Sequence, residues 1–384
     1  MNGVYLHTPF CVSKCPYCDF YSVAATQKTM ESYCALPLSE LDLLLRSFPL
    51  LAGIAADTVY FGGGTPSALG PQRLGRLFTG IRSRLSLARN AEITLEANPG
   101  TLRENDFHRL RESGFNRISL GVQSFHPSTL AALGRIHTAQ QAQDAFRLAR
   151  EAGFSSAGID LIFGNPGQKI ADWAGDLEEA LALSPDHISA YAFTLAPGTP
   201  IRRAVSRGEI TLADDDETAE MYDMASEILS RAGYRRYEIS NFARAGHECR
   251  HNQKYWRRQG CLGLGPSAHG LLFPQESAPL GMWTANPRSL EKYASRIEQG
   301  RLPWAQSGVR SPRDAWEEFL IFGLRTAEGV LLEEGEMMYG PRPEKLTGAV
   351  DRLVDSGYLV RNRGALRMPE KYWFVSNELL LRLA

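Results

Sequence analysis

The sequence has few cysteines, no long apolar run and almost no net charge. Its 384 residues include six cysteines, too few for a small disulfide-stapled scaffold, so a reducing, cytoplasmic setting is expected. No stretch approaches the roughly 18 apolar residues of a membrane span, and the first ten residues lack the basic and apolar segments of a signal peptide. The formal net charge of -1 supplies no global field toward nucleic acid or membrane. We therefore expect a globular protein that does not bind nucleic acid.

A regular alternation of apolar and helical segments fills the first half of the chain. It predicts βαβ units around a parallel sheet. The six apolar runs lie at residues 3–7, 58–61, 92–96, 117–121, 157–162 and 187–192. Polar or glycine-rich residues follow several of them, as at the active-site rim of a barrel. An open doubly wound sheet would gather them at one switch point. The pattern therefore favours an α/β fold built on a partial (β/α)6 TIM-like barrel.

The pattern changes after Pro200. Residues 214–216 lead into a helix, residues 237–243 read as a strand, and a stretch rich in Gly, His, Cys and Trp runs to residue 270. Helices are predicted at 287–298, 313–326 and 344–356, and a turn at 362–364 joins two short strands. Helices followed by such a hairpin resemble a winged-helix module. We assign residues 1–200 to the barrel, 201–282 to its extension, and 283–384 to a mainly helical, winged-helix-like module.

Several helix ends can be predicted from capping residues. Thr101 with Glu104, and Thr138 with Gln141, have the spacing of capping boxes. Asn286 followed by Pro287 has the favoured order of a cap and a first helical residue. These signals predict three helix starts.

Three cysteines crowd into eight residues, at Cys11, Cys15 and Cys18. Thiolates suit zinc and iron–sulfur clusters. Structural zinc usually takes four ligands, whereas three thiolates on a four-iron cluster leave one iron open to another ligand. A zinc site completed by a distant residue such as Cys249 is the alternative. The triplet follows the first predicted strand, where the loops of a barrel build active sites.

The triplet, with Tyr17 before its third cysteine, resembles the radical S-adenosylmethionine superfamily. The resemblance implies a [4Fe-4S] cluster on Cys11, Cys15 and Cys18, whose open iron binds S-adenosylmethionine. Residues 61–66, with Thr65 in place of the usual acid, are similar to the glycine motif of the coproporphyrinogen oxidase-like branch. Taken singly, each later polar residue would be a cap or a salt-bridge partner. By resemblance, the S-adenosylmethionine site comprises Tyr5, Tyr17, Gly63, Gly64, Thr65, Glu96, Gln123, Arg135 and Asp160.

A second motif, His251-Asn252 followed by Tyr255-Trp256, lies in the extension. An imidazole can serve as axial ligand of heme iron, and His251 is the first candidate. The two aromatic rings offer flat surface for a porphyrin. The alternative ligands nearby are His247, His269 and Cys249. The alternative is a purely structural role, in which the motif is an aromatic-rich loop with a hydrogen-bonded histidine. The motif resembles that of the heme-chaperone group within the oxidase-like family. By that resemblance, His251, Asn252, Tyr255 and Trp256 bind heme.

Two further features place the chain in the heme-chaperone group rather than with the oxidases. Phe20 stands where the oxidases continue to a fourth cysteine, and the motif begins as early as residue 11. The resemblance implies a heme chaperone, a cluster electron donor and an acceptor hemoprotein, of which a membrane respiratory cytochrome is a candidate. Peripheral contact with the membrane would then accompany a cytoplasmic location. The alternatives are oxygen-independent decarboxylation of coproporphyrinogen and another radical reaction, such as methyl transfer.

Overall fold

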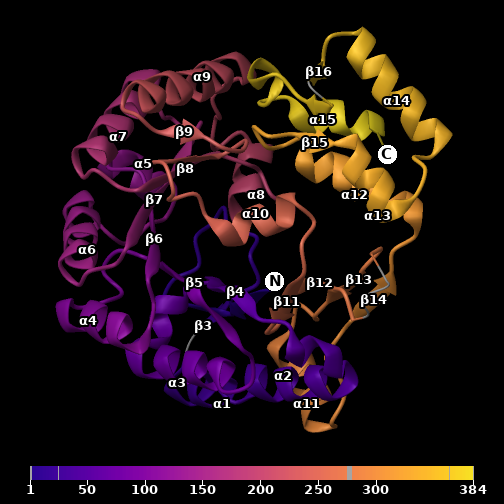
Figure 1. Ribbon diagram of the computed structural model, residues 1–384. Helices are drawn as coiled ribbons and strands as arrows, with labels where there is room; N and C mark the ends of the chain where they lie inside the picture. Colours follow the sequence, from indigo (N-terminus) through magenta and orange to yellow (C-terminus); the bar gives the residue numbers. More distant parts are fainter. Residues whose placement is uncertain (1, 25, 275–278, 363, 384) are drawn as a thin grey trace.

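The computed structural model describes residues 2–24, 26–274, 279–362 and 364–383. At its centre is a curved parallel sheet that forms an incomplete barrel (Figure 1). Its six strands are β1 (Asn2–Thr8), β4 (Ala56–Gly63), β5 (Leu87–Ala97), β6 (Arg117–Gln123), β7 (Ser156–Phe163) and β8 (His187–Ala192). Each pairs in parallel with its neighbour in that order. The predicted barrel and its six strands are confirmed.

Helices cover the outer face of this sheet, as Figure 1 shows. The main covering helices are α3 (Pro71–Arg82), α4 (Glu104–Ser113), α6 (Ala139–Glu151) and α7 (Ile170–Ala182). In α6 the buried residues Ala142, Ala145, Phe146 and Ala149 recur at helical spacing, so one stripe of the helix faces the strands. Phe115 joins the layers, with its ring 5.0 Å from that of Phe61 on β4. Apolar packing thus joins the helical layer to the strands.

Further elements complete the barrel region and its cover. They are β2 (Phe10–Cys11), β3 (Val23–Ala24), α1 (Gln27–Tyr33), α2 (Leu36–Ser47), α5 (Pro127–Ala132), α8 (Pro200–Ser206), α9 (Asp215–Arg231) and α11 (Leu290–Glu298). Buried Glu40 of α2 accepts hydrogen bonds from Gly265 N, Asn286 Nδ2 and Tyr293 Oη. This carboxyl group ties α2 to segments more than 200 residues away.

The sheet continues beyond both edges of the six-stranded core. On one side β11 (Cys261–Leu264) pairs in parallel with β1, followed by antiparallel β12 (His269–Leu272), β13 (Met282–Ala285) and β14 (Gln306–Val309). On the other side β10 (Asn241–Ala243) and β9 (Arg235–Arg236) are antiparallel. The domain boundaries at residues 200 and 282 stay predictions, and the sheet itself runs across both.

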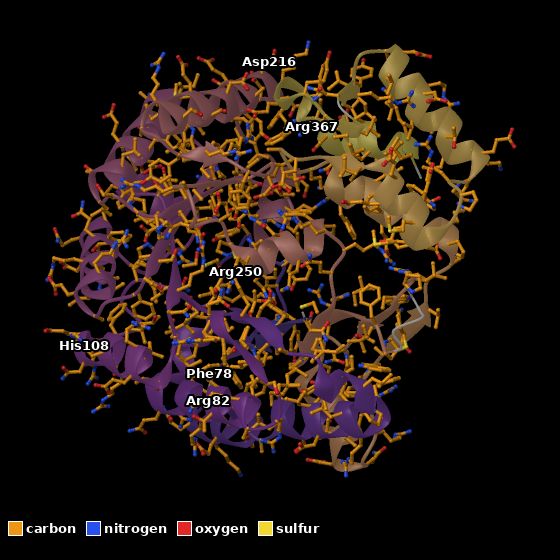
Figure 2. The ribbon with its side chains drawn as sticks, in the orientation of Figure 1. Phe78, Arg82, His108, Asp216, Arg250 and Arg367 are labelled. Atoms are coloured by element: carbon orange, nitrogen blue, oxygen red, sulfur yellow. The ribbon has the colours of Figure 1, made fainter. Side chains whose placement is uncertain are left out.

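A short helix, α10 (Arg250–Trp256), lies across the amino-terminal end of the barrel. The guanidinium of Arg250 donates to the carbonyl oxygens of Asp57 and Asn90, which lie near the starts of β4 and β5. Figure 2 shows Arg250 near the middle of the molecule. The Glu92 carboxylate accepts from the backbone N–H groups of Arg250 and His251 at 3.2 and 3.1 Å, and so caps the helix.

The carboxyl-terminal module lies beside α9 in Figure 1. It contains α12 (Pro312–Gly323), α13 (Leu332–Tyr339), α14 (Glu344–Asp355) and α15 (Ser376–Leu380). A small sheet, in the order β15 (Val330–Leu331), β17 (Ala365–Arg367) and β16 (Val360–Asn362), forms the wing. Arg363, at the centre of the predicted turn, lies outside the described residues. Within the described chain, no helix is both long and apolar enough to cross a membrane.

Three predictions of local structure are wrong or too long. Thr101 does not cap a helix, because its hydroxyl donates to Asn98 O, and α4 begins at Glu104 after Arg103. Asn286 binds Glu40, and Ser289 caps α11 instead. The strand predicted over 237–243 shortens to β10, since the chain turns around Glu238 to pair with Thr326. The box of Thr138 and Gln141 is confirmed.

Candidate functional site

A cavity of about 480 Å³ occupies the interior of the barrel. The loops after β1, β4 and β5 line its rim at the carboxyl-terminal ends of the strands, and side chains of β5 to β8 line its walls. Most of the residues predicted to bind the cluster or S-adenosylmethionine face it: Cys11, Cys15, Cys18, Tyr17, Gly63, Gly64, Thr65, Glu96, Gln123, Arg135 and Asp160. The cavity also reaches Cys249 and Asn252 at the start of α10. One space therefore connects the cysteine loop to the second motif.

The cysteine loop is held against the glycine segment that ends β4. The backbone N–H of Gly64 donates to Thr8 O, and that of Thr65 donates to Phe10 O at 2.7 Å. A Cβ atom at Gly64 would lie 2.7 Å from Phe10 O and 3.1 Å from Cys11 Sγ. Only glycine permits this close approach. The glycine segment therefore fixes the start of the cysteine loop.

Two hydrogen-bond donors point at the cysteine sulfurs. The Thr65 hydroxyl lies 3.5 Å from Cys11 Sγ, and Arg135 Nη1 lies 3.6 Å from Cys15 Sγ. All three thiols are partly exposed to the cavity. Among the described residues, no three His, Cys, Asp or Glu side chains converge tightly enough to hold one metal ion. A four-iron cluster takes one thiolate per iron and so suits more widely spaced sulfurs.

Two carboxyl groups, Glu96 and Asp160, face the cavity from neighbouring parts of its wall. Glu96 accepts from Tyr60 Oη at 2.7 Å and from Gly63 N at 3.2 Å, and burial raises its pKa to about 7. Asp160 accepts from the Ser119 hydroxyl at 3.0 Å, and burial likewise raises its pKa. Carboxyl groups in this setting can accept hydrogen bonds from hydroxyl or amino groups of a ligand.

Gln123 adopts a left-handed conformation, with φ of 70°. The register between β6 and β7 shifts between Gly121 and Gln123, so a bulge turns this side chain into the cavity. Tyr17 also lines the cavity, with its ring 6.1 Å from that of Phe193, and burial raises the pKa of its hydroxyl. Tyr5 is not among the described cavity residues; its hydroxyl is 3.2 Å from His7 Nδ1.

His251 is buried behind the cavity wall, and both of its ring nitrogens are engaged. Nδ1 lies 2.9 Å from the Thr58 hydroxyl, and Nε2 lies 3.0 Å from Tyr255 Oη. Its ring stacks on Tyr60 at 4.9 Å. Burial, with the nearby charge of Lys254, lowers the pKa of His251 to about 3, so the imidazole is neutral. A neutral imidazole is the form that binds a metal.

The four residues of the second motif face different spaces. Asn252 lines the main cavity, whereas Trp256 lines a separate cavity of about 270 Å³ together with Arg235 and Arg257. Tyr255 is 40% exposed. The cations next to the motif are paired: Lys254 with Asp57 at 2.6 Å, Arg257 with Glu328 and Arg258 with Glu318, both at 2.8 Å. The structure thus brings only Asn252 to the cysteine-lined cavity.

Sequence reasoning missed several residues that shape the site. Asn98 connects Thr65 with Arg135, and Tyr60 holds Glu96. Asn98 could have been found, because it follows the third apolar run, two residues after Glu96 and at the same rim. Tyr60 gave no signal, because an aromatic residue within a strand usually packs in the core.

Comparisons with known proteins agree with this geometry. Residues 5–180 match the Radical SAM superfamily, and residues 311–375 match the HemN C-terminal domain. The chain is 36% identical to the heme chaperone HemW of Escherichia coli strain K12, over 98% of this chain and 97% of that protein. It is 34% identical to HemW of Lactococcus lactis, over 98% and 96% of the two chains.

A solved structure with the same overall arrangement is that of coproporphyrinogen III oxidase (HemN) from Escherichia coli, a radical SAM enzyme. The TM-score is 0.83 with 22% sequence identity, over 100% of this chain and 90% of that one. At this identity the likeness establishes the fold: a radical SAM barrel with a carboxyl-terminal module.

Proposed function

Because this chain belongs to the family of HemW heme chaperones, within the radical SAM superfamily, we propose that it binds heme and transfers it to an acceptor hemoprotein. We further propose that it carries a [4Fe-4S] cluster with exchangeable S-adenosylmethionine. One observation carries the proposal. A single cavity extends from the three cysteines, past Glu96 and Asp160, to Cys249 and Asn252 at the start of α10.

The cluster would be held by Cys11, Cys15 and Cys18, which lie together on one loop at the cavity rim. The three thiols and the two hydrogen-bond donors at their sulfurs fit such a group. When bound and reduced, the cluster supplies one electron to S-adenosylmethionine. Arg135 can pair with the carboxylate of that ligand, and Glu96 and Asp160 can accept from its hydroxyl or amino groups. Tyr5, Tyr17, Gly63, Gly64, Thr65 and Gln123 complete the proposed site.

Heme would bind at α10, with His251 as the axial ligand through Nε2. Its neutral imidazole supports this role, but Tyr255 now holds that nitrogen. Heme binding would therefore require Tyr255 to move and α10 to shift from the barrel end. The rings of Tyr255 and Trp256 would then pack on the porphyrin, with Asn252 at the cavity edge. Lys254, Arg257 and Arg258 could exchange their present carboxylate partners for the heme propionates.

The proposal implies two protein partners. One is an electron donor for the cluster. The other is an acceptor hemoprotein, for which we propose a membrane respiratory cytochrome, so the chain would work in the cytoplasm and contact the membrane peripherally. Neither electron transfer to the cluster nor heme transfer to the acceptor needs nucleic acid, in keeping with the net charge of -1.

A heme titration of the cluster-reconstituted protein tests the function. We expect a Soret band that saturates at one heme per chain and is lost or strongly shifted in His251→Ala. His108→Ala is the matched control, because His108 is an exposed histidine on the outer helix α4. Equal binding by His251→Ala and the unmodified protein would remove His251 as ligand.

The same preparation can be given coproporphyrinogen, reductant and S-adenosylmethionine under anaerobic conditions. We expect no conversion to protoporphyrinogen. Conversion at a catalytic rate would contradict a chaperone without oxidase activity and would favour the decarboxylation alternative.

A further inference from the structure

Asn98 lies at the rim immediately after β5, between the residues that contact the cysteine loop. Its side-chain amide both donates and accepts a hydrogen bond. Nδ2 donates to the Thr65 hydroxyl at 3.0 Å, and Oδ1 accepts from Arg135 Nη2 at 2.7 Å. Thr65 follows β4 and Arg135 follows α5, so one amide joins two loops that are 70 residues apart in the chain.

Both partners of Asn98 lead directly to the cysteine sulfurs. The Thr65 hydroxyl, which accepts from Asn98, directs its own hydrogen to Cys11 Sγ. The Arg135 guanidinium, anchored on Asn98 Oδ1 and on Gly121 O at 2.6 Å, directs Nη1 to Cys15 Sγ. Asn98 therefore orients a donor to each of two sulfurs that it does not itself touch.

The backbone of Asn98 is also fixed. Its N–H donates to the Ser67 hydroxyl, and its carbonyl accepts from the N–H and the hydroxyl of Thr101. The side chain thus projects from an anchored turn. Only an amide of this length offers both an acceptor for the guanidinium and a donor for the hydroxyl. Aspartate would lose the donor, and leucine would lose both.

We propose that Asn98 is a positioning residue that sets the reduction potential of the cluster. Hydrogen bonds to cluster sulfurs stabilise the reduced state, which carries the extra negative charge, and so raise the potential. By holding Thr65 and Arg135 against Cys11 and Cys15, Asn98 makes the cluster easier to reduce. This inference rests on the proposed cluster at the three cysteines.

A redox titration followed by electron paramagnetic resonance tests the inference, without S-adenosylmethionine present. The variants are Asn98→Leu, which keeps the branched shape of the side chain and removes both hydrogen bonds, Thr65→Val, and the two combined. We expect Asn98→Leu to move the midpoint potential to a more negative value, and Thr65→Val to move it less. Because Asn98 acts partly through Thr65, the double variant should shift the potential by less than the sum. Asn90→Leu, at an exposed position near the start of the same strand, should leave it unchanged.

Iron and sulfide content must match among the variants, so that the potential is compared at equal cluster occupancy. Asn98→Ser, too short to reach either partner, replaces Asn98→Leu if the leucine does not fold. A full cluster with an unchanged potential in the Asn98 variant would overturn the inference and leave the proposed cluster intact. An additive double variant would also overturn it. Failure of the unmodified protein to hold a four-iron cluster would instead overturn the proposed function.

Discussion

The two ends of the barrel differ in how ready they are for a ligand. At the carboxyl-terminal rim, Thr65, Glu96 and Arg135 line an open cavity, and their polar groups are already oriented. At the amino-terminal end, α10 covers the barrel, and His251 is buried with both ring nitrogens engaged. The rim is thus preorganised for its ligands, whereas the proposed heme end has to rearrange first.

The difference has an energetic consequence. Freeing His251 Nε2 breaks its hydrogen bond to Tyr255. At about 1 kcal/mol, the loss of this bond reduces heme affinity by roughly fivefold relative to an open site. A chaperone must release its cargo, and a closed resting state at this end would favour release.

The largest expected effect is loss of the cluster at the carboxyl-terminal rim, with heme binding at the amino-terminal end retained. Cys18→Ala removes one of the three thiolates, so we expect loss of the broad visible absorption of a reconstituted cluster, because three thiolates are needed to hold it. Heme binding to α10 should persist, as measured by the Soret band. Cys34→Ala is the control, since Cys34 is a buried thiol at the end of α1 that bonds Met30 O. Loss of the cluster in the control as well would contradict the assignment of these ligands.

A smaller effect should appear in the pH dependence of the rim. Burial raises the pKa of Glu96 from its ordinary 4.5 to about 7, so the ionised fraction rises from pH 6 to pH 8. The affinity for S-adenosylmethionine should therefore increase by up to about tenfold over this range. Calorimetric titration at pH 6, 7 and 8 measures it, and Glu96→Gln should flatten the curve.

The same shift predicts the effect of pH on stability. The folded chain binds the Glu96 proton more tightly than the unfolded chain, so its contribution to the free energy of unfolding is full below about pH 4.5. This contribution is lost as the pH rises through about 7.

For the affinity measurement, a pH dependence of S-adenosylmethionine binding that survives Glu96→Gln would assign the titration to another group.

The smallest expected effects are changes in heme affinity at the amino-terminal end, where α10 covers the barrel. Two substitutions next to His251 should change this affinity in opposite directions. Tyr255→Phe frees Nε2 of His251, so heme should bind about fivefold more tightly. Thr58→Val removes the partner that orients Nδ1, so heme should bind more weakly. Soret titrations of both variants, with circular dichroism to confirm folding, measure the two shifts. Shifts of the same sign would contradict ligation through Nε2.

Much of the fold could be predicted from the sequence, because the signals are local. Each of the six strands is a short apolar run bounded by polar or glycine residues, and all six are confirmed. Helix starts were less certain where a polar residue had a long-range partner. Thr101 and Asn286 have the residue types of caps, but Thr101 bonds Asn98 and Asn286 bonds Glu40. Sequence spacing cannot reveal such competition.

The sequence by itself determined the cysteine loop, because the three thiols are fixed by spacing within eight residues. It also determined the family of the chain, through motifs whose residues lie close together. Only the tertiary structure decided the state of His251. Its partner Thr58 is 193 residues away, and the buried setting that keeps the imidazole neutral is assembled from separate strands and α10. Likewise, only folding brings Asn98 between Thr65 and Arg135, because hydrogen bonds depend on positions in space that no local pattern encodes.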